Sequence, residues 1–160
     1  MSSLQVHGTC VALEAGAVLL RGHSGAGKSD LAFRLVHEQG GHLVADDQVI
    51  LESRKDALVA RAKEGWASLI ELRGLGIVSI PSTTSAPLTL LVDLVGRDEV
   101  PRLAKPLYDE LVGHRLPVLR LHAFDATTPA KVKLAITHIP SSGASGSEAH
   151  GFPGDDGRLG

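Results

Sequence analysis

The chain has 160 residues, of which 43% are apolar and 3% aromatic, and a formal net charge of −2. This length fits one domain with an aliphatic core, and the near-neutral charge excludes a general attraction to nucleic acid or acidic membranes. Cys10 is the single cysteine, which excludes an internal disulfide, and its apolar surroundings predict a core position. We expect a cytoplasmic protein, because no apolar stretch could span a bilayer and no signal-peptide pattern opens the chain.

The first elements form a predicted hairpin followed by a helix. Apolar runs at residues 9–13 and 17–21 are separated by the turn residues Glu14, Ala15 and Gly16. A helix is predicted over residues 28–39. It stops at the Gly40-Gly41 pair, because glycine readily adopts the left-handed conformation that ends a helix.

The middle of the chain is predicted to be nearly all strand. Apolar runs bounded by turn residues mark the strands at 42–45, 49–51, 57–60, 68–71, 77–80, 88–95 and 116–121. Residues 52–56 are predicted as a turn, and the charged residues 97–105 as a loop or a short surface helix. Thr128 and Pro129 have the pattern of an N-cap followed by proline, which opens a helix from Ala130 to about His138.

This order of elements predicts an α/β fold with a mixed, strand-rich sheet around a P-loop helix. A doubly wound fold would instead place a helix after each parallel strand. We expect one domain over residues 1–140. Residues 141–160 are rich in Gly, Ser and Asp and contain almost no apolar side chains, which predicts a disordered tail.

Residues 22–29 match the phosphate-binding pattern G-x-x-x-x-G-K-S between a predicted strand and a predicted helix. Glycines let the backbone N–H groups face phosphate oxygens, and the helix N-terminus adds partial positive charge. In this pattern the lysine reaches the β- and γ-phosphates and the serine hydroxyl ligates Mg²⁺. The nucleotide-binding residues predicted from it are Gly22, His23, Ser24, Gly25, Ala26, Gly27, Lys28 and Ser29.

Asp46 and Asp47 follow the predicted strand at 42–45, where a Walker-B acid would lie. One carboxylate can hold Mg²⁺ while the other takes a proton from an acceptor hydroxyl, and the alternative is an aspartate turn in solvent. Glu71 and Arg73 precede two glycines, an arrangement that suits metal and phosphate contacts but also a surface ion pair. The histidines and the cysteine show no zinc-ligand spacing.

Four segments together resemble the catalytic domain of HPr kinase/phosphorylase in order and spacing, over roughly residues 4–138. They are His7-Gly8, the loop 22–30, the segment 43–47 ending in Asp-Asp, and Glu-Leu-Arg-Gly-Leu-Gly-Ile at 71–77. The match is similar to the short, single-domain form of α-proteobacteria, because no separate domain precedes His7. The resemblance implies ATP-dependent phosphorylation of a serine on HPr, the small phosphocarrier of the sugar phosphotransferase system. It also implies a fold akin to the nucleotide domain of phosphoenolpyruvate carboxykinase and a homo-oligomer, commonly a hexamer.

The resemblance implies roles for single residues as well. The catalytic residues by this match are His7, Lys28, Asp46, Asp47 and Arg102. The residues matched to Mg²⁺ are Ser29 and Glu71. Of the two aspartates, Asp47 matches the proton acceptor and Asp46 supports metal or hydrogen bonding. Arg97 is a second match for the family's catalytic arginine.

One departure concerns the reverse reaction, the phosphorolysis of seryl-phosphate. The family's late Arg/Pro/Gly-rich stretch falls near residues 124–131, and its arginines are missing here. Without those groups to hold inorganic phosphate we expect weak or absent phosphorolysis, with Lys131 and Lys133 as poorer substitutes.

Alternative functions are less consistent with the sequence. A small-molecule P-loop kinase normally carries an arginine-rich lid, whereas the arginines here are scattered. A GTPase-type switch needs an N-K-x-D motif, which the sequence lacks. A non-catalytic ATP-binding regulator would lose the base, whereas both aspartates are present. The sequence therefore predicts a protein-serine kinase that uses ATP and Mg²⁺.

Overall fold

The computed structural model describes residues 2–139, and the predicted tail at 141–160 lies outside them. Within the described residues the chain forms a nine-stranded sheet, a two-stranded hairpin and two α-helices. The elements in chain order are β1 (Ser3–His7), β2 (Thr9–Leu13), β3 (Gly16–Arg21), α1 (Lys28–Gln39), β4 (His42–Ala45), β5 (Gln48–Arg54), β6 (Ala57–Ala62), β7 (Leu69–Leu72), β8 (Gly76–Ser79), β9 (Ser85–Leu94), the 3₁₀ turn η1 (Arg97–Glu99), β10 (Tyr108–Leu111), β11 (His114–Leu121) and α2 (Thr128–Thr137). None of the helices in this part of the chain has the length and apolar character to cross a membrane.

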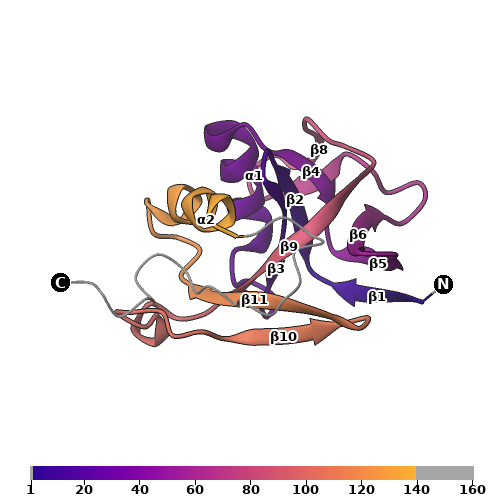
Figure 1. Ribbon diagram of the computed structural model, residues 1–160. Coiled ribbons are helices and arrows are strands. Elements are labelled where there is room, and N and C mark those ends of the chain that lie inside the picture. Colours follow the sequence, from indigo (N-terminus) through magenta and orange to yellow (C-terminus); the bar gives the residue numbers. More distant parts are fainter. Residues whose placement is uncertain (1, 140–160) are drawn as a thin grey trace.

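The large sheet is mixed, as the sequence predicts. Its main path runs β1-β5-β6-β9-β3-β2-β4, with β11 pairing with β9 and β10 with β11. The pairs β3–β9 and β9–β11 are parallel, and the remaining pairs are antiparallel. The long strand β9 lies at the centre, where it pairs with β3 on one side and with β6 and then β11 on the other (Figure 1).

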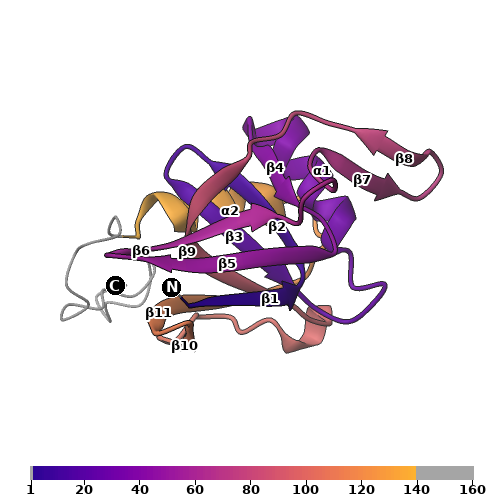
Figure 2. The ribbon, with the colours of Figure 1, turned by 90° about the vertical axis from the view of Figure 1, so that its right-hand side faces the viewer.

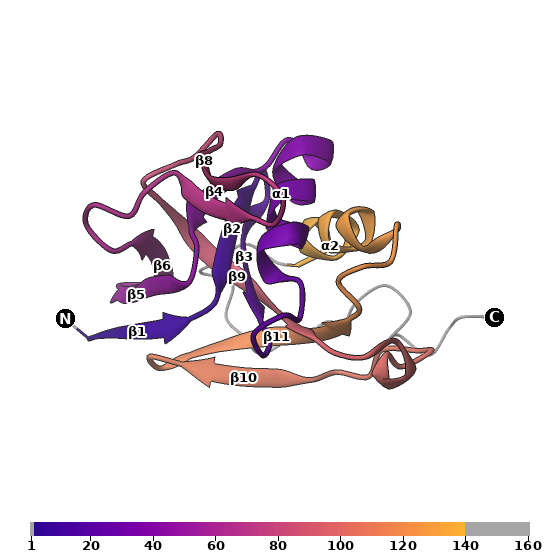
Figure 3. The ribbon, with the colours of Figure 1, turned by 180° about the vertical axis from the view of Figure 1, so that it is seen from behind.

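Each face of the central sheet has its own buried core, because side chains alternate along a strand. On β3, Val18 and Leu20 pack into a cluster with Leu31 and Leu35 of α1, whereas Leu19 packs into a second cluster with residues of β5 and β6. Both helices lie side by side on the first face (Figure 3), and the ribbon of β1, β5 and β6 forms a separate layer (Figure 2). Burial on both faces explains why β3 is a continuous apolar run.

Strand direction brings distant segments to one edge of the sheet. Strands β3, β9 and β11 run parallel, and β4 shares their direction because β2 lies antiparallel between β3 and β4. Their carboxyl ends and the start of β2 therefore meet at one edge, which we call the loop edge. The segments found there are Gly8–Thr9, the loop after β3, and Asp46–Asp47.

Several predicted elements have the expected bounds. The β2–β3 hairpin is confirmed, and α1 spans Lys28–Gln39 and ends at Gly40 in the left-handed conformation (φ 70). Helix α2 is confirmed but spans Thr128–Thr137, so it begins two residues before the predicted start at Ala130 and has Thr127 rather than Thr128 as its N-cap residue. The predicted turn at 52–56 is wrong in part, since β5 continues to Arg54 and its residues 49–54 pair with β6.

Two strands have no counterpart among the sequence predictions. Strand β1 pairs only with β5, and β10 pairs only with β11, so both lie at sheet borders. Most of their residues are exposed or half-buried. They therefore lack the apolar alternation on which strand prediction depends, and backbone pairing with a neighbour determines their conformation.

Candidate active site

The predicted phosphate-binding loop at residues 22–29 joins β3 to α1 and packs against the segment that follows β11. Gly27 is the N-cap residue of α1, has φ 101, and its carbonyl accepts a 2.9 Å hydrogen bond from the N–H of Leu31. A Cβ at this position would lie 2.6 Å from the Cβ of Ala123 and 2.8 Å from the ring of Phe124. Both the backbone conformation and the available space therefore require glycine at the last loop position.

Lys28 folds back onto the loop from the first turn of α1. Its Nζ donates to the carbonyl oxygen of Gly22 at 2.6 Å and to that of His23 at 3.0 Å. The ammonium group is thus held at the same loop whose backbone surrounds the predicted phosphate position. The loop combines a helix N-terminus, a lysine charge and glycine-dependent curvature, which is a geometry that can bind the phosphates of a nucleotide.

Asp46 connects three elements at the loop edge. One of its oxygens, Oδ1, accepts a 3.0 Å hydrogen bond from the Ser29 hydroxyl of α1 and a 2.8 Å hydrogen bond from the Thr9 hydroxyl of β2. Asp46 is half-buried, and the Thr9 side chain is buried. The carboxylate lies directly beside the loop serine, which is the arrangement of an acid that supports a metal-binding hydroxyl.

Asp47 has a different partner because the chain turns sharply between β4 and β5. The N–H of Gln48 donates to the carbonyl oxygen of Asp46 at 2.8 Å, and Asp47 between them has φ 72. This is a three-residue γ-turn in its rarer positive-φ form. The side-chain Oδ1 of Asp47 lies 3.1 Å from Nδ1 of His7. Both side chains are about half exposed, Asp47 at 56% and His7 at 55%.

Other predicted residues form no contact with this group in the described structure. Glu71 lies on the exposed face of β7, and Arg102 is exposed between η1 and β10. Neither side chain makes a hydrogen bond or an ion pair with another residue of 2–139. No three His, Cys, Asp or Glu side chains in that range gather into a possible metal site. At the loop itself, the structure shows the hydrogen bond from Ser29 to Asp46, both of them predicted site residues.

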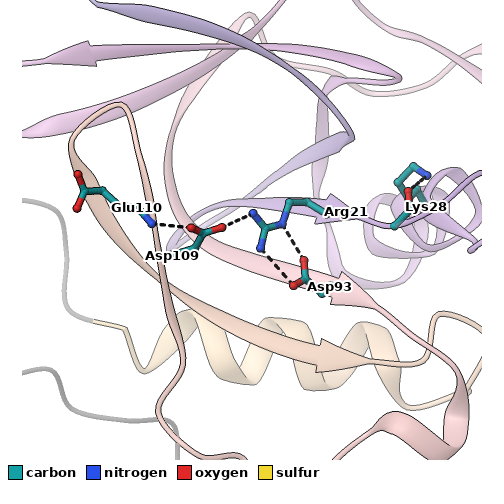
Figure 4. Close-up of polar contacts among 6 residues, drawn as sticks. Arg21, Lys28, Asp93, Asp109 and Glu110 are labelled. Atoms are coloured by element: carbon teal, nitrogen blue, oxygen red, sulfur yellow. Dashed lines mark hydrogen bonds and ion pairs between the residues drawn. The ribbon is translucent and has the colours of Figure 1, made fainter.

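An ion cluster beside the loop was missed by the sequence predictions (Figure 4). Arg21, the last residue of β3, donates through Nε to Asp93 at 2.7 Å and through Nη1 to Asp109 at 2.7 Å. Its signal in the sequence is a single arginine at the end of a buried strand, directly before Gly22. The two acids come from β9 and β10, so only the pairing of strands brings them to Arg21.

The electrostatics of this cluster are mutually stabilising. The hydrogen bond from Arg21 lowers the pKa of Asp109. Partial burial of the carboxylate acts in the opposite direction but is the smaller effect. Burial disfavours the charged form of Arg21, but the hydrogen bonds to Asp93 and Asp109 raise its pKa overall. Arg21 therefore fastens β9 and β10 to the strand that carries the loop.

Residues 124–131, where the arginines expected from the family resemblance are missing, are contacted by two arginines from other elements, Arg34 and Arg97. Arg34 of α1 donates to the backbone carbonyls of Ala123 and Asp125, and Arg97 of η1 pairs with the Asp125 carboxylate at 2.8 Å. Arg34 thus links the turn before α2 to helix α1, and Arg97 links the same turn to η1. Lys131 and Lys133 are exposed on α2.

Comparison with known proteins places this arrangement in one family. The family model described as "HPr Serine kinase C-terminal domain" matches residues 1–88, a range that includes the loop, both aspartates and Glu71. The HPr kinase/phosphorylase 1 of Oceanobacillus iheyensis is 33% identical over 134 residues, which cover 79% of this chain and 42% of that relative. The HPr kinase/phosphorylase of Bacillus subtilis is 45% identical over 76 residues, covering 47% of this chain and 24% of that relative.

The chain thus spans less than half the length of these relatives. A solved structure, that of the Hpr(Ser) kinase/phosphatase from Coxiella burnetii, matches with a TM-score of 0.71 at 22% identity, covering 81% of this chain and 86% of that chain. This likeness shows that the two share a fold. Because the family model covers more than half of the chain and spans the loop and both aspartates, the chain belongs to the HPr serine kinase C-terminal domain family.

Proposed function

We propose that this chain is the catalytic domain of an ATP-dependent protein-serine kinase that phosphorylates the phosphocarrier HPr. The observation that carries the proposal is that two adjacent acids at the loop edge contact different partners. Asp46 contacts the loop serine, whereas Asp47 faces His7. A phosphate-binding loop alone would suit any nucleotide-binding protein, but a separate acid beside it supplies a proton acceptor for a hydroxyl substrate.

The loop binds and orients the triphosphate in this proposal. Lys28 exchanges its contacts with the carbonyls of Gly22 and His23 for the β- and γ-phosphate oxygens. The geometry fits Mg²⁺ as well, since Ser29 and Asp46 place two oxygen ligands 3.0 Å apart at the start of α1. Mg²⁺, when bound, neutralises charge on the phosphates during transfer. Glu71 stays a predicted metal ligand.

Asp47 is the proposed general base. As the serine oxygen of the substrate forms its bond to the γ-phosphorus, the bond to ADP breaks and the serine proton passes to the Asp47 carboxylate. His7 lies 3.1 Å from that carboxylate and keeps it oriented toward the loop edge. Both side chains are about half exposed, which leaves them accessible to a serine on another protein. Arg102 is proposed to add positive charge near the transferred phosphate.

The reverse reaction is proposed to be weak or absent. Arg34 and Arg97, the two arginines that reach the stretch near residues 124–131, are engaged by carbonyl and carboxylate oxygens of the protein itself. They are therefore poorly placed to bind inorganic phosphate. Incubating phosphoserine-HPr with phosphate and measuring pyrophosphate release tests this, and rapid release would contradict it.

The direct test is purified protein with ATP, Mg²⁺ and HPr, followed by mass spectrometry for phosphoserine. Asp47→Asn is expected to keep nucleotide affinity within about threefold while lowering turnover by about 10²–10⁴-fold, since it removes only the base. Lys28→Ala is expected to lose nucleotide binding. Asp56→Asn is the matched control, because Asp56 is an exposed acid in the turn between β5 and β6. Absence of phosphoserine on HPr while ATP is bound would reject the function.

We also propose that the active form is a homo-oligomer, as the family resemblance implies. Light scattering coupled to size exclusion is expected to give six times the mass of the chain. A monomer that phosphorylates HPr at full rate would contradict this part of the proposal without affecting the assigned chemistry.

A further inference from the structure

Thr9 is a buried hydroxyl that faces the candidate site from the sheet side. It is the first residue of β2, its side chain is 1% exposed, and its Oγ1 donates to Asp46 Oδ1 at 2.8 Å. A buried hydroxyl that directs its proton to a half-buried carboxylate is an energetically significant contact, because loss of either partner leaves a polar group without its hydrogen bond.

The contact has a specific geometric consequence. The same oxygen, Oδ1, also accepts the hydrogen bond from Ser29 at 3.0 Å. Asp46 is therefore held from two sides, by a residue of β2 that belongs to the rigid sheet and by a residue of α1 that belongs to the predicted metal site. Ser29 alone would leave the carboxylate free to follow the serine or to rotate away from it.

We infer that Thr9 is a positioning residue that fixes the Asp46 carboxylate so that Ser29 presents its hydroxyl oxygen to the metal of a bound Mg²⁺-nucleotide. This inference rests on the proposed function. In this inference the Ser29 hydroxyl keeps donating its proton to Asp46. Its oxygen lone pairs are then free to bind the metal. Thr9 itself touches neither substrate nor metal.

The chain offers a matched control for Thr9. Thr89 on β9 is also a buried threonine, at 8% exposure, and its Oγ1 is the one buried side-chain polar atom in residues 2–139 without a hydrogen-bond partner. Substituting valine for threonine keeps the shape of the side chain and removes the hydroxyl. Thr9→Val thus removes a donor that Asp46 uses, whereas Thr89→Val removes a donor that has no partner.

The test measures ADP binding by calorimetry with and without Mg²⁺ in wild type, Thr9→Val, Thr9→Ser and Thr89→Val. We expect Thr9→Val to reduce the Mg²⁺-dependent gain in affinity about three- to tenfold, with metal-free ADP affinity unchanged. Thr9→Ser, which keeps the hydroxyl, and Thr89→Val are expected to match wild type. A gain in Thr9→Val equal to that of wild type would overturn the inference.

Two further outcomes are distinguishable. If wild type itself binds ADP no better with Mg²⁺, the proposed function fails, and with it the inference. If Thr9→Val does not fold, a crystal structure of the unmodified protein with Mg²⁺ and ADP decides the matter. Thr9 Oγ1 is expected within hydrogen-bond distance of Asp46, and an Asp46 side chain turned away from Thr9 would reject the positioning role.

Discussion

At the scale of single residues, the candidate site depends on small features with strict geometric requirements. Asp47 adopts a φ of 72, a conformation that few residues other than glycine adopt and that Asp tolerates better than most. The turn at Asp47 sends two neighbouring carboxylates to different partners, Asp46 to Ser29 and Asp47 to His7. Backbone strain of this kind persists only where surrounding contacts hold it, and here the N–H of Gly8 donates a hydrogen bond to the Asp47 carbonyl.

Gly27→Ala is expected to weaken ATP binding strongly and to lower the free energy of unfolding by about 1–3 kcal/mol. The added methyl group would meet the Cβ of Ala123 at 2.6 Å, at a residue whose φ is 101. The segment after β11 must then move away from the loop. Thermal unfolding and ATP titration of the variant measure both effects.

The control for this prediction is Gly65→Ala. Gly65 also has a positive φ, of 85, but a Cβ there has no neighbour within 4 Å and the residue lies in the loop after β6. It is expected to cost stability without changing ATP affinity. Equal losses of ATP affinity in the two variants would show that the steric contact at Gly27 is unimportant.

At the scale of elements, Arg21 links three strands beside the phosphate-binding loop. It pairs with Asp93 on β9 in strand register and with Asp109 on β10, so the β10–β11 hairpin is fastened to the strand that leads into Gly22. Because all three side chains are partly exposed to solvent, at 25% to 46%, the cluster contributes through geometry more than through a large energy.

The stabilising effect of Asp109 is expected to depend on pH. Its pKa is lowered in the folded protein by the hydrogen bond from Arg21, so the carboxylate stabilises the fold above the unfolded-state pKa of about 3.9. This contribution disappears as the pH falls through the lower folded-state pKa. Asp109→Asn should therefore be less stable than wild type at pH 7, by no more than about 1 kcal/mol, and this difference should vanish once the pH falls below the folded-state pKa.

Urea unfolding at several pH values measures this difference. Glu110→Gln is the control, since the neighbouring Glu110 is exposed and contributes only its backbone N–H to Asp109. A difference between wild type and Asp109→Asn that grows toward acid pH would contradict the assigned direction of the pKa shift.

At the scale of the whole molecule, the described residues contain a complete two-sided core. One cluster joins the sheet to both helices, and the other joins it to the ribbon of β1, β5 and β6. The central strands β3 and β9 contribute to both clusters. The loop edge therefore lies on a scaffold that is packed on two faces, which favours a fixed placement of Thr9, Ser29 and Asp46.

A protein shortened to residues 1–140 is expected to unfold at the same temperature as the full chain and to bind ATP equally well. Both buried clusters and the predicted nucleotide-binding residues lie in residues 2–139. Differential scanning calorimetry and ATP titration of the two proteins test this. A lower unfolding temperature for the shortened protein would show that residues 141–160 contribute to the folded domain.

Sequence patterns predicted the elements that are locally encoded. The helix at 28–39, the hairpin before it and the mixed sheet follow from apolar periodicity and glycine positions, which act over a few residues. Prediction failed at β1 and β10, because their residues are largely exposed and their strand conformation comes from pairing. The sequence analysis also predicted that β5 ends at residue 51. The strand continues because Glu52 pairs with Val59 and its side chain accepts a hydrogen bond from Arg61.

The phosphate-binding loop was determined by the sequence itself, because its eight residues are consecutive and their geometry depends on glycine and a helix start. The partners of that loop were decided only by the tertiary structure. Thr9 and Ser29 lie 37 and 17 residues from Asp46, and Asp109 lies 88 residues from Arg21. Such contacts depend on the order and direction of strands, which no local pattern encodes. For this reason the different partners of Asp46 and Asp47 become visible only in the fold.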